Sequence, residues 1–262
     1  MKLFNSVLAA AVLAWVAPAE AHFQLIYTPK VNLEKRTEIP LLLVFWHPFA
    51  NGHAMDMGRP EQFFVINKHK KTDLLGTLAP VTFKGAENSA AAFETKFTPK
   101  GLGDYVFGLV PAPYLETSED KYIQQITKSF VNLGGAPTDW DKPLGLPTEI
   151  VPLNKPTAIV AGSTFSGRVL SEGEPVADAE VEIEYIAAEP DLATRSAGKP
   201  SVTPPPGGTL IAKTDANGIF TFGIPKAGFW GFAALGVGPA KKFEGKDLSQ
   251  DAVIWVRAND LK

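Results

Sequence analysis

Glycine and proline interrupt this chain so often that long helices have little room to form. The 262 residues include 23 glycines and 22 prolines, and both residue types disfavour helix interiors and mark turns. Between them lie short segments rich in valine, isoleucine, phenylalanine, threonine and tyrosine, which are typical of β-strands. In the first half the predicted strands are 23–27, 38–46, 62–67, 74–83, 91–97 and 105–110. Their spacing predicts an all-β protein built from sandwiches.

The strand pattern resumes after a break, which predicts two β-sandwich domains. The break is segment 134–156, which is rich in glycine and proline, so we expect domains over 22–150 and 156–262. A proline-rich excursion at 187–209 is expected either to be a mobile surface loop without chemistry, or to touch a partner or close over the other domain. The predicted strands of the second half are 148–151, 164–170, 181–186, 210–214, 218–224, 228–235 and 252–257.

One short helix is expected near the end of the first domain. Thr117 and Ser118 offer hydroxyl groups for an N-cap, and acidic residues follow in the first turn. Tyr122, Ile126 and Phe130 then recur at a spacing of four residues, which is typical of an amphipathic helix. This helix is predicted to lie across one end of the sandwich.

The N-terminus has the three parts of a secretory signal peptide. Residues 1–21 carry a lysine at position 2, continue in a short apolar run, and end in Ala19-Glu20-Ala21, a small-x-small cleavage site. The apolar run is shorter than the roughly 20 residues that a transmembrane helix needs. We therefore expect cleavage after Ala21 and a mature, exported protein in the periplasm.

The composition limits which classes of ligand this protein can bind and which residues can bind them. Lysine and arginine number 25 against 28 aspartate and glutamate residues, so the formal net charge of −3 gives no broad attraction to nucleic acid. The chain has no cysteine, so any metal site must use histidine, methionine, carboxylate or main-chain ligands.

Histidine is therefore the first residue type to consider as a metal ligand, and the chain has four: His22, His47, His53 and His69. Cleavage after Ala21 makes His22 the first residue of the mature chain, where its α-amine and imidazole Nδ1 can chelate one ion. A third nitrogen would complete a histidine brace, which suits Cu(II) or Ni(II). His69 lies among lysines that repel cations, so we expect it to be solvated.

The segment 45–57 supplies further candidate ligands. His47 and His53 flank an Asn-Gly turn after an apolar strand, and such a turn would bring both histidines to one rim of the sandwich, near the mature N-terminus. Met55 and Met57 are weaker candidates that add soft sulfur, although packing in a core is their commoner role. Asp56 is a weaker candidate ligand or an acceptor for an imidazole N–H.

Two resemblances extend these expectations. A first set of segments, in the C-terminal half, resembles transthyretin-like sandwich modules of secreted proteins. These segments are Ser166–Val169, Glu174–Val181, Thr214–Phe220 and the Pro225…Gly228-Phe229-Trp230 series. A second set of segments resembles the extracytoplasmic nickel/cobalt uptake family, whose members are encoded beside energy-coupling transporter subunits. These segments are Ala21-His22-Phe23, the block from Phe45 to Pro60, and Pro147-Thr148-Glu149-Ile150-Val151-Pro152-Leu153. The second resemblance implies a periplasmic component that hands Ni²⁺ or Co²⁺ to a membrane permease.

Other functions are compatible with the same sequence features. A periplasmic copper protein with a histidine brace uses the same ligands, a brace oxygenase is the enzymatic version, and a structural or adhesive sandwich pair needs no metal. The GxSxG, GxxxxGK[ST] and HExxH motifs are missing from the sequence, so we expect a protein that is not an enzyme.

Overall fold

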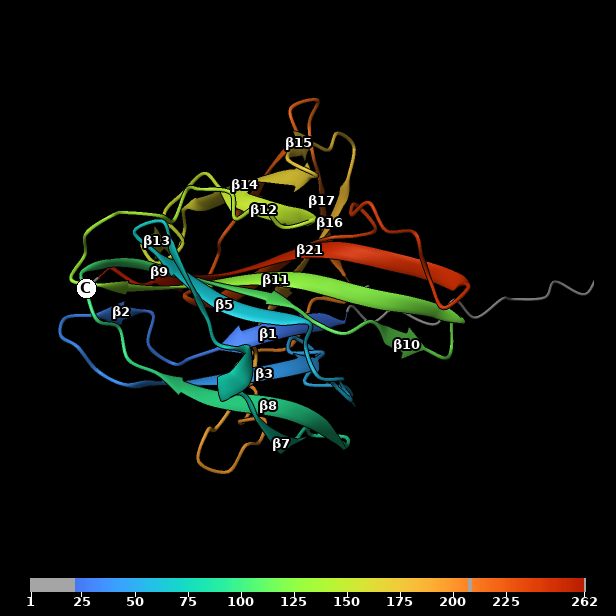
Figure 1. Ribbon diagram of the computed structural model, residues 1–262, viewed down its shortest axis with the longest axis horizontal. Helices are drawn as coiled ribbons and strands as arrows, with labels where there is room; N and C mark the ends of the chain where they lie inside the picture. Colours follow the sequence, from blue (N-terminus) through green and yellow to red (C-terminus); the bar gives the residue numbers. More distant parts are fainter. Residues whose placement is uncertain (1–21, 207–208, 262) are drawn as a thin grey trace, which may run out of the picture.

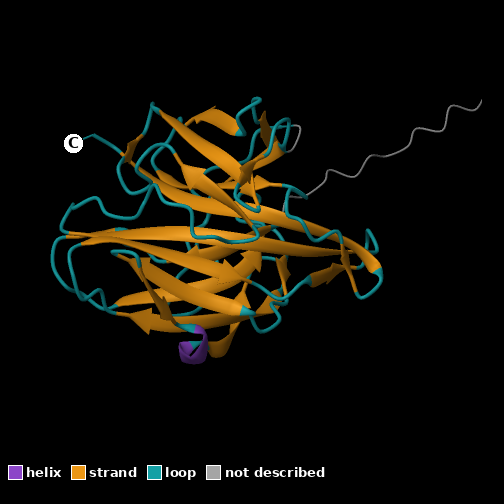
Figure 2. Ribbon diagram, turned by 45° about the horizontal axis from the view of Figure 1, so that its top comes forward, coloured by secondary structure: helices purple, strands orange, loops and turns teal. Residues whose placement is uncertain are grey.

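The computed structural model describes residues 22–206 and 209–261 and shows an all-β protein. Strands form nearly all of its regular structure (Figure 2), as the sequence predicts. The predicted signal peptide, residues 1–21, lies outside the described residues. Within the described ranges, none of the helical segments has the length and hydrophobicity that a transmembrane helix requires.

The first sheet is formed entirely by residues 23–97. Its strand order is β1-β3-β8-β7, with β4 paired to β3. The bounds are β1 Phe23–Tyr27, β3 Ile39–Trp46, β4 Ala54–Met55, β7 Ala79–Lys84 and β8 Ser89–Phe97.

The second sheet runs through both halves of the protein. Its order is β17-β16-β19-β21-β11-β9-β5-β6, and the short strands β2, β10, β13 and β20 pair along β11 and β21. The bounds are β2 Asn32–Leu33, β5 Gln62–Asn67, β6 Lys70–Asp73, β9 Gly103–Val110, β10 Tyr114–Glu116, β11 Lys121–Leu133, β13 Ile159–Val160, β16 Glu180–Tyr185, β17 Leu210–Lys213, β19 Gly228–Ala234, β20 Lys242–Phe243 and β21 Lys246–Asn259. Because β11 pairs in parallel with β21, the two halves share one continuous sheet.

The third sheet covers the C-terminal part of the second. It comprises β12 Thr148–Pro152, β14 Thr164–Ser171, β15 Glu174–Pro175 and β18 Ile219–Gly223. In Figure 1 this sheet lies above β11 and β21, and the first sheet lies below them.

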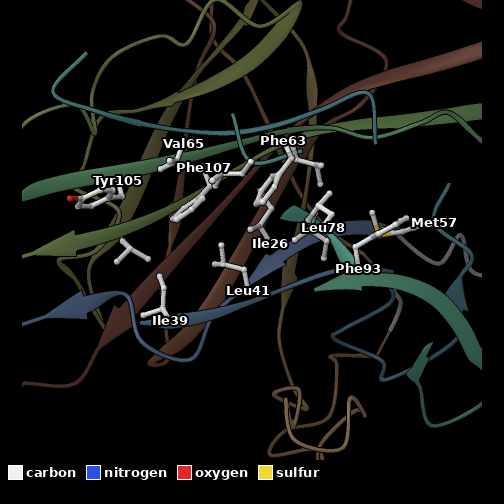
Figure 3. Packing of buried hydrophobic residues seen from close by; sticks show 14 of the residues in the cluster. Ile26, Ile39, Leu41, Met57, Phe63, Val65, Leu78, Phe93, Tyr105 and Phe107 are labelled. Carbon is white, nitrogen blue, oxygen red and sulfur yellow. The ribbon is translucent and has the colours of Figure 1, made fainter. Parts of the chain in front are cut away.

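Buried apolar side chains fill the spaces between these layers. One core lies between the first sheet and β5 and β9, where Ile26 and Leu41 meet Phe63 and Phe107 (Figure 3). A second core lies between the third sheet and β16, β19 and β21. A third core packs the other face of the first sheet against β19 and β21. Strand β3 is therefore buried on both faces, which explains its nearly continuous apolar sequence.

The predicted helix over residues 117–130 is wrong. Residues Lys121–Leu133 form strand β11, and the only helical element among the described residues is a 3₁₀ turn, η1, at Leu75–Thr77. A spacing of four residues is also a multiple of the strand period of two, so Tyr122, Ile126 and Phe130 share one face of a strand equally well. Neighbours on both sides of β11 then decide in favour of the strand.

The excursion between β16 and β17 closes over the N-terminal half of the protein. Arg195 makes two hydrogen bonds, of 2.8 and 2.7 Å, to the carboxylate of Glu94 on β8. Lys84 N donates to Arg195 O at 2.8 Å, and the hydroxyl of Tyr27 donates to Glu189 Oε2 at 2.9 Å. Of the two expectations for 187–209, the contacts of its described residues support closure over the other domain.

Candidate metal site

Three of the four histidines lie in one row across neighbouring strands. Phe23 pairs with Trp46, so His22 follows as the partner of His47 at the next position in the β1–β3 register. Trp46 pairs with Ala54, so His53 is the next partner of His47 on the other side. The main-chain hydrogen bond from His47 N to His53 O, at 3.3 Å, continues this ladder.

His22 and His47 are in contact. Their ring centroids are 4.5 Å apart with an interplanar angle of 55°. The His22 ring also lies 5.6 Å from the ring of Phe45 and 6.4 Å from that of Tyr114. His47 is only 3% exposed, and the His22 side chain is 18% exposed. The predicted approach of His22 to the 45–57 segment is thus present in the fold.

Glu116 is a functional candidate that sequence reasoning missed. Its Oε2 atom lies 3.1 Å from His22 Nε2, and its side chain is 12% exposed. Ser118 donates to Glu116 Oε1 from its main-chain N at 2.9 Å and from its hydroxyl at 2.5 Å. The sequence offered no signal for this role, because Glu116 precedes the residues that we interpreted as a helix N-cap.

The electrostatics of this pair favour a neutral imidazole beside an ionised carboxylate. Burial lowers the pKa of His22, and this effect outweighs the opposing influence of Glu116. Burial alone would raise the pKa of Glu116, but hydrogen bonds from Ser118 and the proximity of His22 lower it overall. A neutral imidazole is the form that binds metal.

The loop between His47 and His53 is held from both ends. Asn51 adopts a positive φ of 55°, as the Asn-Gly turn requires, and Gly52 N donates to His47 O at 3.1 Å. Phe49 N donates to Glu184 Oε2 at 2.8 Å, so a C-terminal strand fixes the chain just after His47.

The His53 imidazole is not brought to the His22–His47 pair. It is exposed, and its Nε2 atom lies 3.4 Å from Asn88 Nδ2. Asn88 is itself fixed, because its side chain accepts from Ala54 N and donates to Ala54 O, both at 2.8 Å. His53 therefore shares the row, and its ring lies beside Asn88.

The weaker candidate ligands have other partners. Met55 is 1% exposed in the first core, and Met57 lies in the same core with its Sδ atom 3.4 Å from Gln24 Nε2. Asp56 is exposed and accepts a hydrogen bond from Ala91 N at 2.7 Å. His69 is solvated as expected, and its Nδ1 atom lies 3.5 Å from Asp139 Oδ1.

A small cavity adjoins the pair. Its lining includes Gln24, Phe45, Met57, Tyr114 and Gln125, and its volume of about 10 Å³ corresponds to roughly one water molecule. Across residues 22–206 and 209–261, no three histidine, aspartate or glutamate side chains converge in an arrangement that could hold a metal ion. A metal here would therefore need ligands beyond these side chains.

Comparison with known proteins identifies a family. A family model described as "Domain of unknown function (DUF4198)" matches residues 19–238. No curated protein matches the chain.

Solved structures also match the chain, at low identity and low structural similarity. The D0-D1 domain of Intimin is 14% identical, with 88% of this chain and 96% of that chain covered and a TM-score of 0.23. The fibronectin(III)-like modules of Clostridium thermocellum CbhA are 9% identical, with coverages of 91% and 95% and a TM-score of 0.21.

Proposed function

We propose that this chain, which belongs to the DUF4198 family, binds one Ni²⁺ or Co²⁺ ion at its mature N-terminus and delivers it to a membrane uptake transporter. The contact between His22 Nε2 and Glu116 Oε2 carries this proposal. With Nε2 facing a carboxylate, the ring presents Nδ1, the nitrogen nearer the main chain, for a chelate with the α-amine. Metal-binding histidines commonly donate their other ring N–H to a carboxylate, which fixes the tautomer and the ring orientation.

His47 is the proposed third nitrogen ligand. Its ring is 4.5 Å from that of His22, and its burial restricts the space in which it can turn. One amine and two imidazoles form a nitrogen set that suits Ni(II) and Cu(II). Cleavage after Ala21 is needed to create the amine, so export and site formation are coupled in this proposal.

His53 is proposed as an additional ligand that joins after the ion has bound. It occupies the position across from His47, and its exposed ring can turn without displacing core residues. Its contribution should be smaller than that of His47, because the turn gives up the contact with Asn88.

A series of histidine variants tests the ligand set. In the mature protein, His47→Ala should weaken Ni(II) binding by on the order of 100-fold, and His53→Ala by about tenfold, since even changes outside the ligand shell cost 10–100-fold. His69→Ala, at an exposed site beside Asp139, is the matched control and should bind as the wild type does. Isothermal titration calorimetry measures all three, and equal affinities would remove His47 and His53 from the site.

Delivery to a transporter is tested in the cell of origin. Deleting the gene should lower nickel or cobalt accumulation when the metal is scarce, and expression with the permease should restore it. Affinity alone does not discriminate, because Cu(II) outranks Ni(II) at almost any nitrogen site. Unchanged nickel and cobalt uptake together with altered copper tolerance would instead support copper handling.

A further inference from the structure

The outer edge of strand β1 is paired by side chains rather than by another strand. β1 is the last strand of the first sheet on this side, with β3 as its neighbour. Gln24 O nevertheless accepts from Trp255 Nε1 at 2.9 Å and from Thr127 Oγ1 at 3.4 Å. The second sheet thus supplies the hydrogen bonds that this buried edge needs.

The Gln125 carboxamide does the same at the first residues of the mature chain. Its Nε2 donates to His22 O at 2.7 Å, and its Oε1 accepts from Gln24 N at 2.8 Å. A carboxamide carries the same donor and acceptor as a peptide group, so Gln125 pairs with His22 and Gln24 as a neighbouring strand would. These two bonds fix the main chain on the C-terminal side of the proposed amine ligand.

Gln125 is itself fixed by a buried aspartate. Gln125 Nε2 also lies 3.3 Å from Asp251 Oδ2, and Gln125 and Asp251 are 3% and 1% exposed. Asp251 Oδ1 accepts from Gly236 N at 2.7 Å and from Ser249 Oγ at 2.6 Å. The chain of contacts therefore runs from the β19–β20 connection through Asp251 and Gln125 to His22.

We infer that Gln125, held by Asp251, is a positioning residue that aligns the α-amine and imidazole of His22 for metal binding. This inference rests on the proposed metal-binding function. Gln125 contacts the His22 carbonyl and the Gln24 N–H rather than the ligand atoms, so it acts by restricting the main chain next to the amine of residue 22. Without Gln125, the α-amine and Nδ1 would be ordered only when the metal binds, and the entropy lost in ordering them would weaken binding.

Gln124 provides a matched control on the same strand. It is 4% exposed, its Nε2 donates to Pro111 O at 2.9 Å, and its Oε1 accepts from Gln250 Nε2 at 2.7 Å. It is therefore a buried glutamine with a comparable network whose bonds do not involve His22.

The test compares Gln125→Glu with Gln124→Glu in the mature protein, titrated with Ni(II) alone. Gln125→Glu keeps the acceptor for Gln24 N but loses the donor to His22 O and places a carboxylate against Asp251. We expect it to weaken Ni(II) binding by 10–100-fold and to shift the visible absorption of the bound ion, while Gln124→Glu changes neither. Gln125→Met and Gln124→Met, which add no charge, replace this pair if either glutamate variant fails to fold.

The outcomes separate this inference from the proposed function. If the wild type binds Ni(II) and the Gln125 variants match it in affinity and absorption, the positioning role is overturned while the metal site stands. Equal losses in the Gln124 and Gln125 variants would also overturn it, because the effect would then be general destabilisation. If the mature wild type binds no Ni(II), the proposed function fails and the inference falls with it.

Discussion

A protein that retains Ala21 ahead of His22 should bind Ni(II) on the order of 100-fold or more weakly than one that begins at His22. In the longer form the nitrogen of residue 22 is an amide, so the chelate between that nitrogen and Nδ1 loses its amine. Loss of a ligand should exceed the 10–100-fold effect that changes outside the ligand shell produce. Calorimetric titration of the two forms measures the difference.

The two forms differ by one residue, so their thermal stabilities without metal should agree and serve as the control. His69→Ala in the shorter form should keep full affinity. Equal Ni(II) affinity in the longer and shorter forms would show that the terminal amine is not a ligand, and the proposed site would then lose its main-chain nitrogen.

Lys128→Ala should lower the free energy of unfolding by about 3–5 kcal/mol, the cost typical of breaking one side of a buried ion pair. Lys128 Nζ on β11 lies 2.8 Å from Glu149 Oε2 on β12, and the two side chains are 1% and 3% exposed. Glu149 also accepts from the main-chain N of Leu144 and Gly145 at 2.9 Å. Removing the ammonium group leaves a buried carboxylate without its counter-ion. Urea denaturation gives the difference directly.

Lys96→Ala is the matched control for this prediction. Lys96 Nζ lies 3.2 Å from Glu38 Oε1, but the side chains are 73% and 55% exposed, and such surface pairs contribute about 0–1 kcal/mol. A loss for Lys128→Ala no larger than that for Lys96→Ala would mean that the pair does not stabilise the junction between β11 and β12.

Local sequence was sufficient for most of the strands. The predicted strand 23–27 coincides with β1 and 62–67 with β5, and 38–46 differs from β3 by one residue. Most residues within these segments are aliphatic or aromatic, so local propensity agrees with the strands that form. The predicted strand 74–83 was too long, because the 3₁₀ turn η1 precedes β7.

The sequence also indicated His22 and His47 together as candidate metal ligands. Their contact follows from antiparallel pairing of β1 with β3, which joins segments fewer than thirty residues apart. The direction of the His53 ring did not follow, because Asn88 on the loop before β8 decides it.

The tertiary structure alone decided the conformation of residues 121–133 and the surroundings of the candidate site. A spacing of four residues fits a helix or one face of a strand, and the choice depends on the hydrogen bonds that β9 and β21 offer to β11. The same parallel pairing with β21 brings Gln125 beside Asp251, 126 residues later in the chain, and Gln125 meets His22 103 residues earlier. Contacts over such separations leave no local pattern, because they depend on how the sheets stack rather than on the residues adjacent to each partner.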